Sequence, residues 1–168
     1  MKLTNTLKVT ALIALFSFAS CTPDTTLEED FTQADADYEI SNIDVDSKLS
    51  LEVLEEINAY RASIGLSALE LQNTPTNLAA QHSDYMANSG EINHDNFGSR
   101  SDVLISQGAL HVSENVAYGY ANAQKVVKGW LNSPSHKEAI EGDFNFTGIA
   151  VVQDDRGIPF YTQIFIKQ

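Results

Sequence analysis

The sequence has a single cysteine, Cys21, among its 168 residues, and only 10 basic residues against 23 acidic ones. One cysteine excludes an intrachain disulfide and any zinc site built from cysteines. The formal net charge of −13 repels phosphate backbones, and no cluster of Lys or Arg offsets it, so we expect no nucleic-acid partner. No apolar run is long enough for a stable transmembrane anchor. These absences leave an acidic chain of a length that suits one ordinary domain.

The N-terminal residues have the pattern of a targeting segment. Lys2 and Lys8 precede an apolar run over 9–19, which has the length of a signal-peptide core. The run ends in Phe18-Ala19-Ser20-Cys21, and small residues before a cysteine resemble the cleavage box of bacterial lipoproteins. We therefore interpret 1–20 as a signal peptide and Cys21 as the lipidated first residue of an exported protein held at a membrane of the bacterial cell envelope. An ordinary secretory signal with an incidental cysteine is the alternative.

The next segment, 21–48, combines the lipidated Cys21 with an acidic stretch. It contains nine Asp and Glu residues, with Lys48 as its only basic residue, and its apolar residues follow no sustained period. Such a composition is typical of a solvated, flexible tether. We place the folded domain at 49–168, and the sequence leaves open a short strand within 38–45.

Within 49–168 the hydrophobic pattern changes from helical to strand periodicity. A helix from 49, with Ser50 as its cap, ends at Gly65, and a second begins at Thr74-Pro75. Helical spacing and turn residues then predict a loop over 91–101, a short helix over 102–107, a helix over 121–131 that restarts after Pro134, and a hairpin of strands 147–152 and 159–166. Helices followed by a terminal hairpin predict an α+β domain with helices packed on a small antiparallel sheet.

Several blocks, in order along the chain, carry a family resemblance: Ile57-Asn58-Ala59-Tyr60-Arg61, Ala79-Ala80-Gln81-His82, Ile92-Asn93-His94, Ser113-Glu114-Asn115-Val116-Ala117, Trp130 to His136, and Tyr161-Thr162-Gln163-Ile164-Phe165. Together they resemble the CAP superfamily of cysteine-rich secretory proteins, antigen 5 and plant pathogenesis-related-one proteins, over about 49–168. The resemblance implies a three-layer α-β-α sandwich with a central antiparallel sheet and a large cleft. It also implies secretion, and disulfide-free members exist among bacteria.

The same resemblance indicates where a site would lie. In the animal and plant branches two His and two Glu can hold a divalent metal in the cleft. His94 and Glu114 match the first His and the first Glu, whereas Ser133 and Phe160 occupy the positions of the other two. The bacterial Ser-Pro-Ser-His block supplies His136, which we expect to face the same cleft. Two imidazoles and a carboxylate could hold zinc or another divalent cation with one position open for water.

Without a metal, the same three residues have two further interpretations. His94 and His136 beside Glu114 could take part in acid–base chemistry, or all three could be polar residues of a cleft wall.

The remaining candidates are weaker. His82 lies between Leu78 and Tyr85 on the second helix, which favours a half-buried histidine with its hydrogen bonds satisfied. His111 is placed in a loop with no role. Three aromatic residues could line an apolar groove, namely Tyr118, Tyr120 and Trp130. Packing in the core is the favoured interpretation for them. Ser133 and Ser135 lie near His136 but show no nucleophile motif.

These features favour a membrane-anchored binding module, rather than an enzyme, with a cleft for a small or lipidic ligand. Lipid binding is known among eukaryotic members of the family. One alternative is a metal-assisted hydrolase or protease that uses His94, Glu114 and His136. The other is an envelope domain that binds a protein partner.

Overall fold

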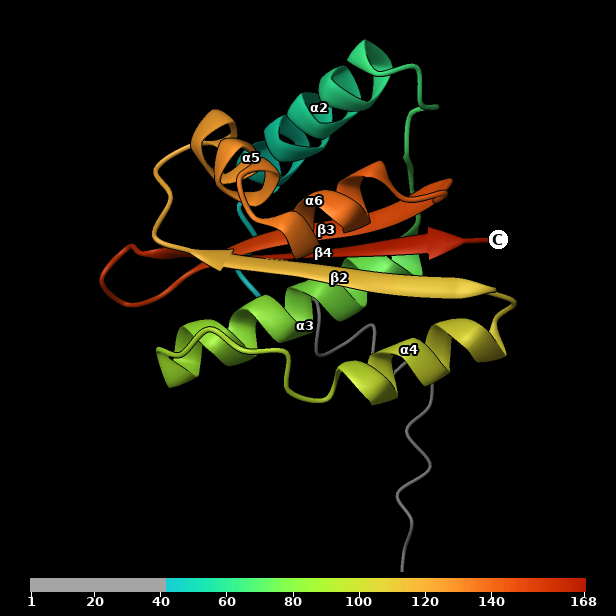
Figure 1. The fold of residues 1–168 in the computed structure, drawn as a ribbon. Coiled ribbons are helices and arrows are strands. Elements are labelled where there is room, and N and C mark those ends of the chain that lie inside the picture. The colour runs from blue at the N-terminus through green and yellow to red at the C-terminus, as the bar shows by residue number, and fades with distance from the viewer. Residues whose placement is uncertain (1–41) are drawn as a thin grey trace, which may run out of the picture. The chain divides into compact units, whose positions relative to one another are not determined.

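The structure is a computed structural model, and it describes residues 42–168. Helices lie on both sides of a central sheet (Figure 1). In chain order the elements are α2 (Ser47–Ser63), β1 (Glu70–Leu71), α3 (Asn73–Ser89), α4 (Phe97–Ser106), β2 (His111–Tyr118), α5 (Ala123–Leu131), α6 (Pro134–Glu141), β3 (Phe146–Gln153) and β4 (Pro159–Lys167). The predicted α+β sandwich is confirmed.

The sheet has four strands in the order β1-β3-β4-β2. β4 pairs antiparallel with β2 on one side and with β3 on the other, while the two-residue β1 runs parallel to β3. Figure 1 shows α2, α5 and α6 above the sheet and α3 and α4 below it. Because the strand order leaves β2 at the end of the sheet, this strand has β4 on one side and, among residues 42–168, no strand on the other.

Apolar side chains fill the space on both faces of the sheet. On β4, Tyr161 and Phe165 belong to the core under α2 and α5, and Ile164 and Ile166 belong to the core over α3. The close packing of α3 depends on Gly148 in β3, because a Cβ at that position would collide with the backbone of Pro75. Among the described residues, no helix is both long and apolar enough to cross a bilayer.

The folded domain begins before residue 49, which corrects the predicted boundary. Val45 forms a β-bridge with Val152, and the side chain of Asp46 caps α2 by accepting a hydrogen bond from the Leu49 N–H. Ser50, the predicted cap, is instead buried inside the first turn, where its Oγ accepts a hydrogen bond from the Val151 N–H. Residues 42–48 therefore belong to the domain. Cys21, the signal peptide and the rest of the tether lie outside the described residues.

The loop before α4 and the strand β2 also differ from the prediction, and the two-residue β1 was not predicted. The predicted loop over 91–101 ends at Asn96, whose φ of 57° lies in the left-handed region, and α4 begins at Phe97. Gly98 and Ser99 lie in its first turn although both have a lower helix propensity than Ala. The hydrogen bonds that Arg100 makes to Glu114 and Asp95 hold this turn in place, and such tertiary contacts override propensity. The strand β2 was not predicted, and His111, assigned to a loop, is its first residue. The hairpin of β3 and β4 was predicted correctly.

Candidate functional site

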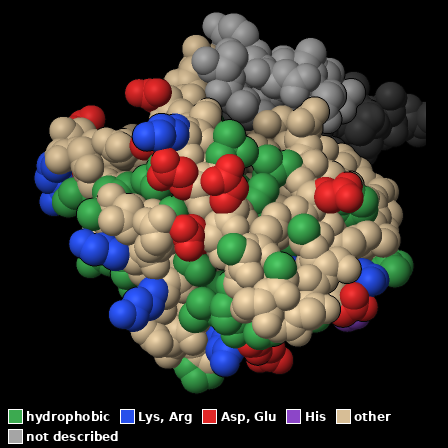
Figure 2. All heavy atoms as spheres, turned by 90° about the horizontal axis from the view of Figure 1, so that it is seen from above, with side chains coloured by type: hydrophobic (Ala, Val, Ile, Leu, Met, Phe, Trp, Pro, Cys, Tyr) green, Lys and Arg blue, Asp and Glu red, His purple; other side chains and the backbone are tan. Residues whose placement is uncertain are grey.

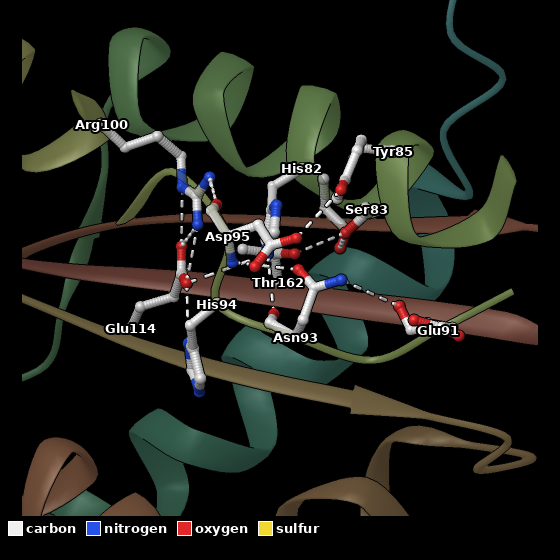
Figure 3. A network of polar contacts seen from close by, with 11 residues as sticks. His82, Ser83, Tyr85, Glu91, Asn93, His94, Asp95, Arg100, Glu114 and Thr162 are labelled. Atoms are coloured by element: carbon white, nitrogen blue, oxygen red, sulfur yellow. Dashed lines mark hydrogen bonds and ion pairs between the residues drawn. The ribbon is translucent and has the colours of Figure 1, made fainter. Parts of the chain in front are cut away.

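The site is built around Glu114, a carboxylate on the edge strand β2 whose side chain is only 1% exposed. Strand alternation sends Glu114 to the face covered by α3 and α4, and sends its neighbour Asn115 to the opposite face. A buried carboxylate is stable only when charged partners or hydrogen-bond donors replace the water it has lost. Figure 3 shows these partners reaching Glu114 from α4 and from the loop that connects α3 to α4.

Arg100 of α4 supplies the compensating charge. Its Nε donates to Glu114 Oε2 and its Nη2 donates to Oε1, both at 2.9 Å, so the guanidinium and the carboxylate meet in a two-bond arrangement. The Nη1 of Arg100 donates to the carbonyl of Asp95 and thereby ties the α3–α4 loop to the same centre. Arg100 is itself 8% exposed, so this is a buried ion pair. Arg100 was not predicted as a site residue.

His94, in the α3–α4 loop, contacts the same carboxylate. Its Nδ1 lies 2.9 Å from Glu114 Oε1, and since a carboxylate only accepts hydrogen bonds, Nδ1 carries the proton. The ring is half exposed, so a group outside the network can reach it. The predicted pairing of His94 with Glu114 is therefore present in the structure.

His82 completes the centre from α3. Its Nε2 donates to the carbonyl of Asn93 at 2.9 Å and lies 4.0 Å from Glu114 Oε1. Burial lowers the pKa of His82, with the nearby Arg100 guanidinium acting in the same direction, so the ring is neutral at pH 7. The expectation of a histidine with satisfied hydrogen bonds is confirmed, but the residue is 3% exposed rather than half buried. It holds the loop that positions His94.

His136 lies on the other face of the sheet, at the start of α6. The side-chain amide of Asn115 donates to its backbone carbonyl, and its ring lines a cleft of about 540 Å³. Burial lowers the pKa of His136, and so does the charge of His94 when that ring is protonated. The cleft follows the end of β2 and is walled largely by aromatic and small residues: Ile92, Val116, Ala117, Tyr118, Gly119, Tyr120, Gly129, Trp130, Ser133 and His136.

The aromatic residues therefore divide between the two roles considered for them. Trp130 is 2% exposed and packs in the core, and its indole N–H donates to the carbonyl of Val116. Tyr118 is 52% exposed and stands in the cleft wall, so core packing is wrong for this residue. Ser133 also lines the cleft, whereas Phe160 is buried in the core.

The arrangement does not fit the zinc set of His94, Glu114 and His136. Both oxygens of Glu114 are held by Arg100, and one also accepts from His94, so a metal would have to displace a buried guanidinium. Within the part of the chain that the structure describes, no three His, Cys, Asp or Glu side chains are placed to hold a metal ion. With the carboxylate neutralised by an arginine, the centre is suited to fixing the α3–α4 loop beside the cleft.

The sequence profile of the cysteine-rich secretory protein family, CAP, matches residues 54–165, which include every site residue described above. The chain belongs to the CAP family. Two curated relatives come from Bacillus subtilis. The uncharacterized membrane protein YlbC is 33% identical over 70% of this chain and 34% of its own length, and the uncharacterized protein YkwD is 34% identical over 68% of this chain and 45% of its own length. This CAP chain thus spans less than half the length of either relative.

Solved structures confirm the CAP fold. An outer surface protein of Borrelia burgdorferi superposes with a TM-score of 0.66 at 26% identity, over 73% of this chain and 94% of that one. An extracellular protein with an SCP domain from Bacillus anthracis gives a TM-score of 0.61 at 25% identity, over 72% and 41% of the two chains.

Proposed function

We propose that this CAP-family protein is an exported, lipid-anchored binding module that holds the apolar part of a ligand in the cleft beside β2. The observation that carries the proposal is the composition of that cleft. Tyr118 and Tyr120 provide an apolar wall that the buried Trp130 backs, while Ser133 and His136 add two polar groups to the lining. A cavity of this size with few polar groups is the usual form of a small-molecule or lipid site.

Export is supported by the relatives, one of which is described as an outer surface protein and another as extracellular. A metal-assisted hydrolase is not favoured, because the carboxylate that would serve it is bound to Arg100.

Nile red, a neutral dye whose fluorescence rises in apolar surroundings, tests the cleft. We expect the protein to enhance its fluorescence and Ser133→Phe to weaken binding about tenfold or more, because the new ring occupies the cavity. Ser133 makes no side-chain cap bond to α6, so its replacement removes none. Ser135→Phe is the matched control, because Ser135 is exposed two residues away and does not line the cleft. Equal loss in both variants, or no enhancement by the unmodified protein, would contradict the proposal.

A further inference from the structure

The outer edge of β2 differs from the opposite edge of the sheet. At the opposite edge, β1 has only two residues, and Val45 bridges to β3 beyond it. β2 has eight residues and pairs with β4 along its whole length in a continuous register without a bulge. Natural proteins usually protect a long edge strand with Lys, Pro, a bulge or a covering segment. β2 contains neither Lys nor Pro, and its one acidic side chain, Glu114, turns inward to Arg100.

The hydrogen-bond phase of β2 identifies the groups that point away from the sheet. Gly119 donates its N–H to the carbonyl of Pro159, which makes the odd-numbered residues of β2 the ones bonded to β4. The N–H and C=O groups of Val112, Glu114 and Val116 therefore point outward. The Val116 carbonyl accepts a hydrogen bond from the indole N–H of Trp130. Within the described residues, the other outward groups of these three have no hydrogen-bond partner.

The outward groups are accessible at the centre of the strand. Glu114 is 8% exposed as a whole residue, although its side chain is only 1% exposed, so its contact with solvent is made by its main chain. The edge is also continuous with the cleft, whose wall begins at Val116. His94 flanks the edge from the α3–α4 loop, and His136 flanks it from α6. A chain lying along Val112–Glu114 would be directed into the cleft.

We propose that the β2 edge, defined as the outward N–H and C=O groups of Val112 and Glu114 and the outward N–H of Val116, binds an extended polypeptide that pairs with it as a fifth strand and inserts an apolar side chain into the cleft. The inference rests on the proposed function of the cleft and names its ligand class. Donors and acceptors at the spacing of a strand match peptide main chain, whereas a lipid or an apolar small molecule would leave them unpaired.

The charge of the domain favours a basic segment as the occupant. Residues 42–168 contain 16 Asp and Glu against 8 Lys and Arg. On the face seen in Figure 2, the Lys and Arg side chains lie apart from one another rather than forming a patch. A second copy of this acidic chain would be repelled, while a peptide rich in Lys or Arg would be attracted.

The test uses a synthetic peptide with alternating Thr and Lys residues and one central Phe, together with an analogue N-methylated at every second amide. Main-chain pairing depends little on the peptide sequence, so this one peptide is enough to test for strand addition. By amide hydrogen exchange in isotope-labelled protein, we expect the N–H groups of Val112 and Glu114 to become protected when the peptide binds. Those of Ser113 and Asn115 are already protected by β4. We expect the N-methylated analogue, which lacks the donors, to bind at least about tenfold more weakly.

Two variants of the protein provide a matched comparison. Val112→Pro removes an outward N–H and part of a side chain, whereas Val112→Ala removes side-chain packing but keeps the N–H. We expect only the proline variant to lose peptide affinity, again by roughly tenfold. If Val112→Pro does not fold, the difference in affinity between the peptide and its N-methylated analogue still tests whether main-chain pairing occurs.

The outcomes separate this inference from the proposal for the cleft. Nile red binding without peptide binding, or peptide binding that leaves the amides of Val112 and Glu114 unprotected, would overturn the fifth strand and leave the apolar cleft supported. Protection that appears without peptide and grows with protein concentration would assign the edge to a second copy and overturn the peptide proposal. Failure of both probes would remove both proposals.

Discussion

At the scale of single residues, Arg61 shows how this fold holds a buried cation. The residue is 2% exposed, and its guanidinium donates to the backbone carbonyls of Ser67, Ile140, Gly142 and Phe144. One side chain thereby ties the end of α2 to the loop between α6 and β3. No apolar residue of similar size could satisfy those four carbonyls.

We therefore expect Arg61→Met to lower the free energy of unfolding by roughly 3–5 kcal/mol, because several buried carbonyls lose their donor at about 1–3 kcal/mol each. Urea unfolding followed by circular dichroism measures the change. Arg156→Met is the control, because the Arg156 side chain is 69% exposed and, among the described residues, it bonds only to Asp154. A loss below about 1 kcal/mol at Arg61 would show that water or the local backbone replaces the guanidinium.

A second expectation concerns pH. Burial lowers the pKa values of His82 and His136 below their ordinary value of 6.5, so the unfolded chain binds more protons than the folded one as the solution is acidified. The stability from these neutral rings is present above pH 6.5 and is lost as the pH falls through the folded pKa values. We expect the urea midpoint to fall between about pH 7 and pH 5. His82→Gln should reduce that fall, because glutamine keeps an N–H donor for Asn93 without titrating. An unchanged slope in His82→Gln would assign the pH dependence to other groups.

The residues of the site were predicted only in part from the sequence. His94 and Glu114 were identified because they match a family pattern, and their contact is present. Arg100 and His82 were not assigned to the site, because they reach Glu114 from two different helices and no local spacing records that convergence. His136 was predicted to face the same cleft as His94 and Glu114. Its ring lines the cleft beside β2, whereas the Glu114 side chain lies on the opposite face of that strand.

At the scale of elements, periodicity predicted those segments whose burial is one-sided and regular. The helices α2, α3 and α5 and the hairpin of β3 and β4 follow such patterns. β2 escaped prediction because its centre, Ser113-Glu114-Asn115, reads as polar. It lies in a sheet because Arg100 and His136 satisfy those polar groups, which is information from the tertiary structure alone.

A prediction at the scale of elements concerns the N-cap of α2. Asp46 accepts a hydrogen bond from the Leu49 N–H at 2.9 Å, the arrangement of a helix N-cap. We expect Asp46→Ala to lower the free energy of unfolding by about 1 kcal/mol, and Asp46→Asn to restore most of it. Asp44→Ala is the matched control, since no cap bond involves Asp44. Chemical unfolding of the three variants measures the differences, and equal effects at Asp44 and Asp46 would contradict the assignment of the cap.

At the scale of the whole molecule, helices cover the two faces of the sheet and β2 lies at its edge (Figure 1), where residues 116–118 line the cleft. The two Bacillus subtilis relatives are more than twice as long as the part they share with this chain, so the CAP domain also occurs in larger chains. Function lies in the sites that a fold carries rather than in the fold itself, so the surface of this domain has to be interpreted from its own residues. In this chain, the sequence predicts that a lipid on Cys21 anchors the domain to a membrane.

We expect Cys21→Ser to release the protein from membranes, or to leave its signal peptide uncleaved, because acyl chains on Cys21 would be the anchor left after cleavage. Each buried methylene contributes about 0.8 kcal/mol to membrane attachment, so loss of all the chains should move nearly the whole population. Fractionation of expressing cells, with immunoblotting of membrane and soluble fractions, measures the distribution. Ser20→Ala is the control, because it keeps a small residue before the cysteine and should leave the protein in the membrane fraction. Membrane retention of Cys21→Ser at the level of the unmodified protein, with its signal peptide removed, would show that another part of the chain supplies the attachment.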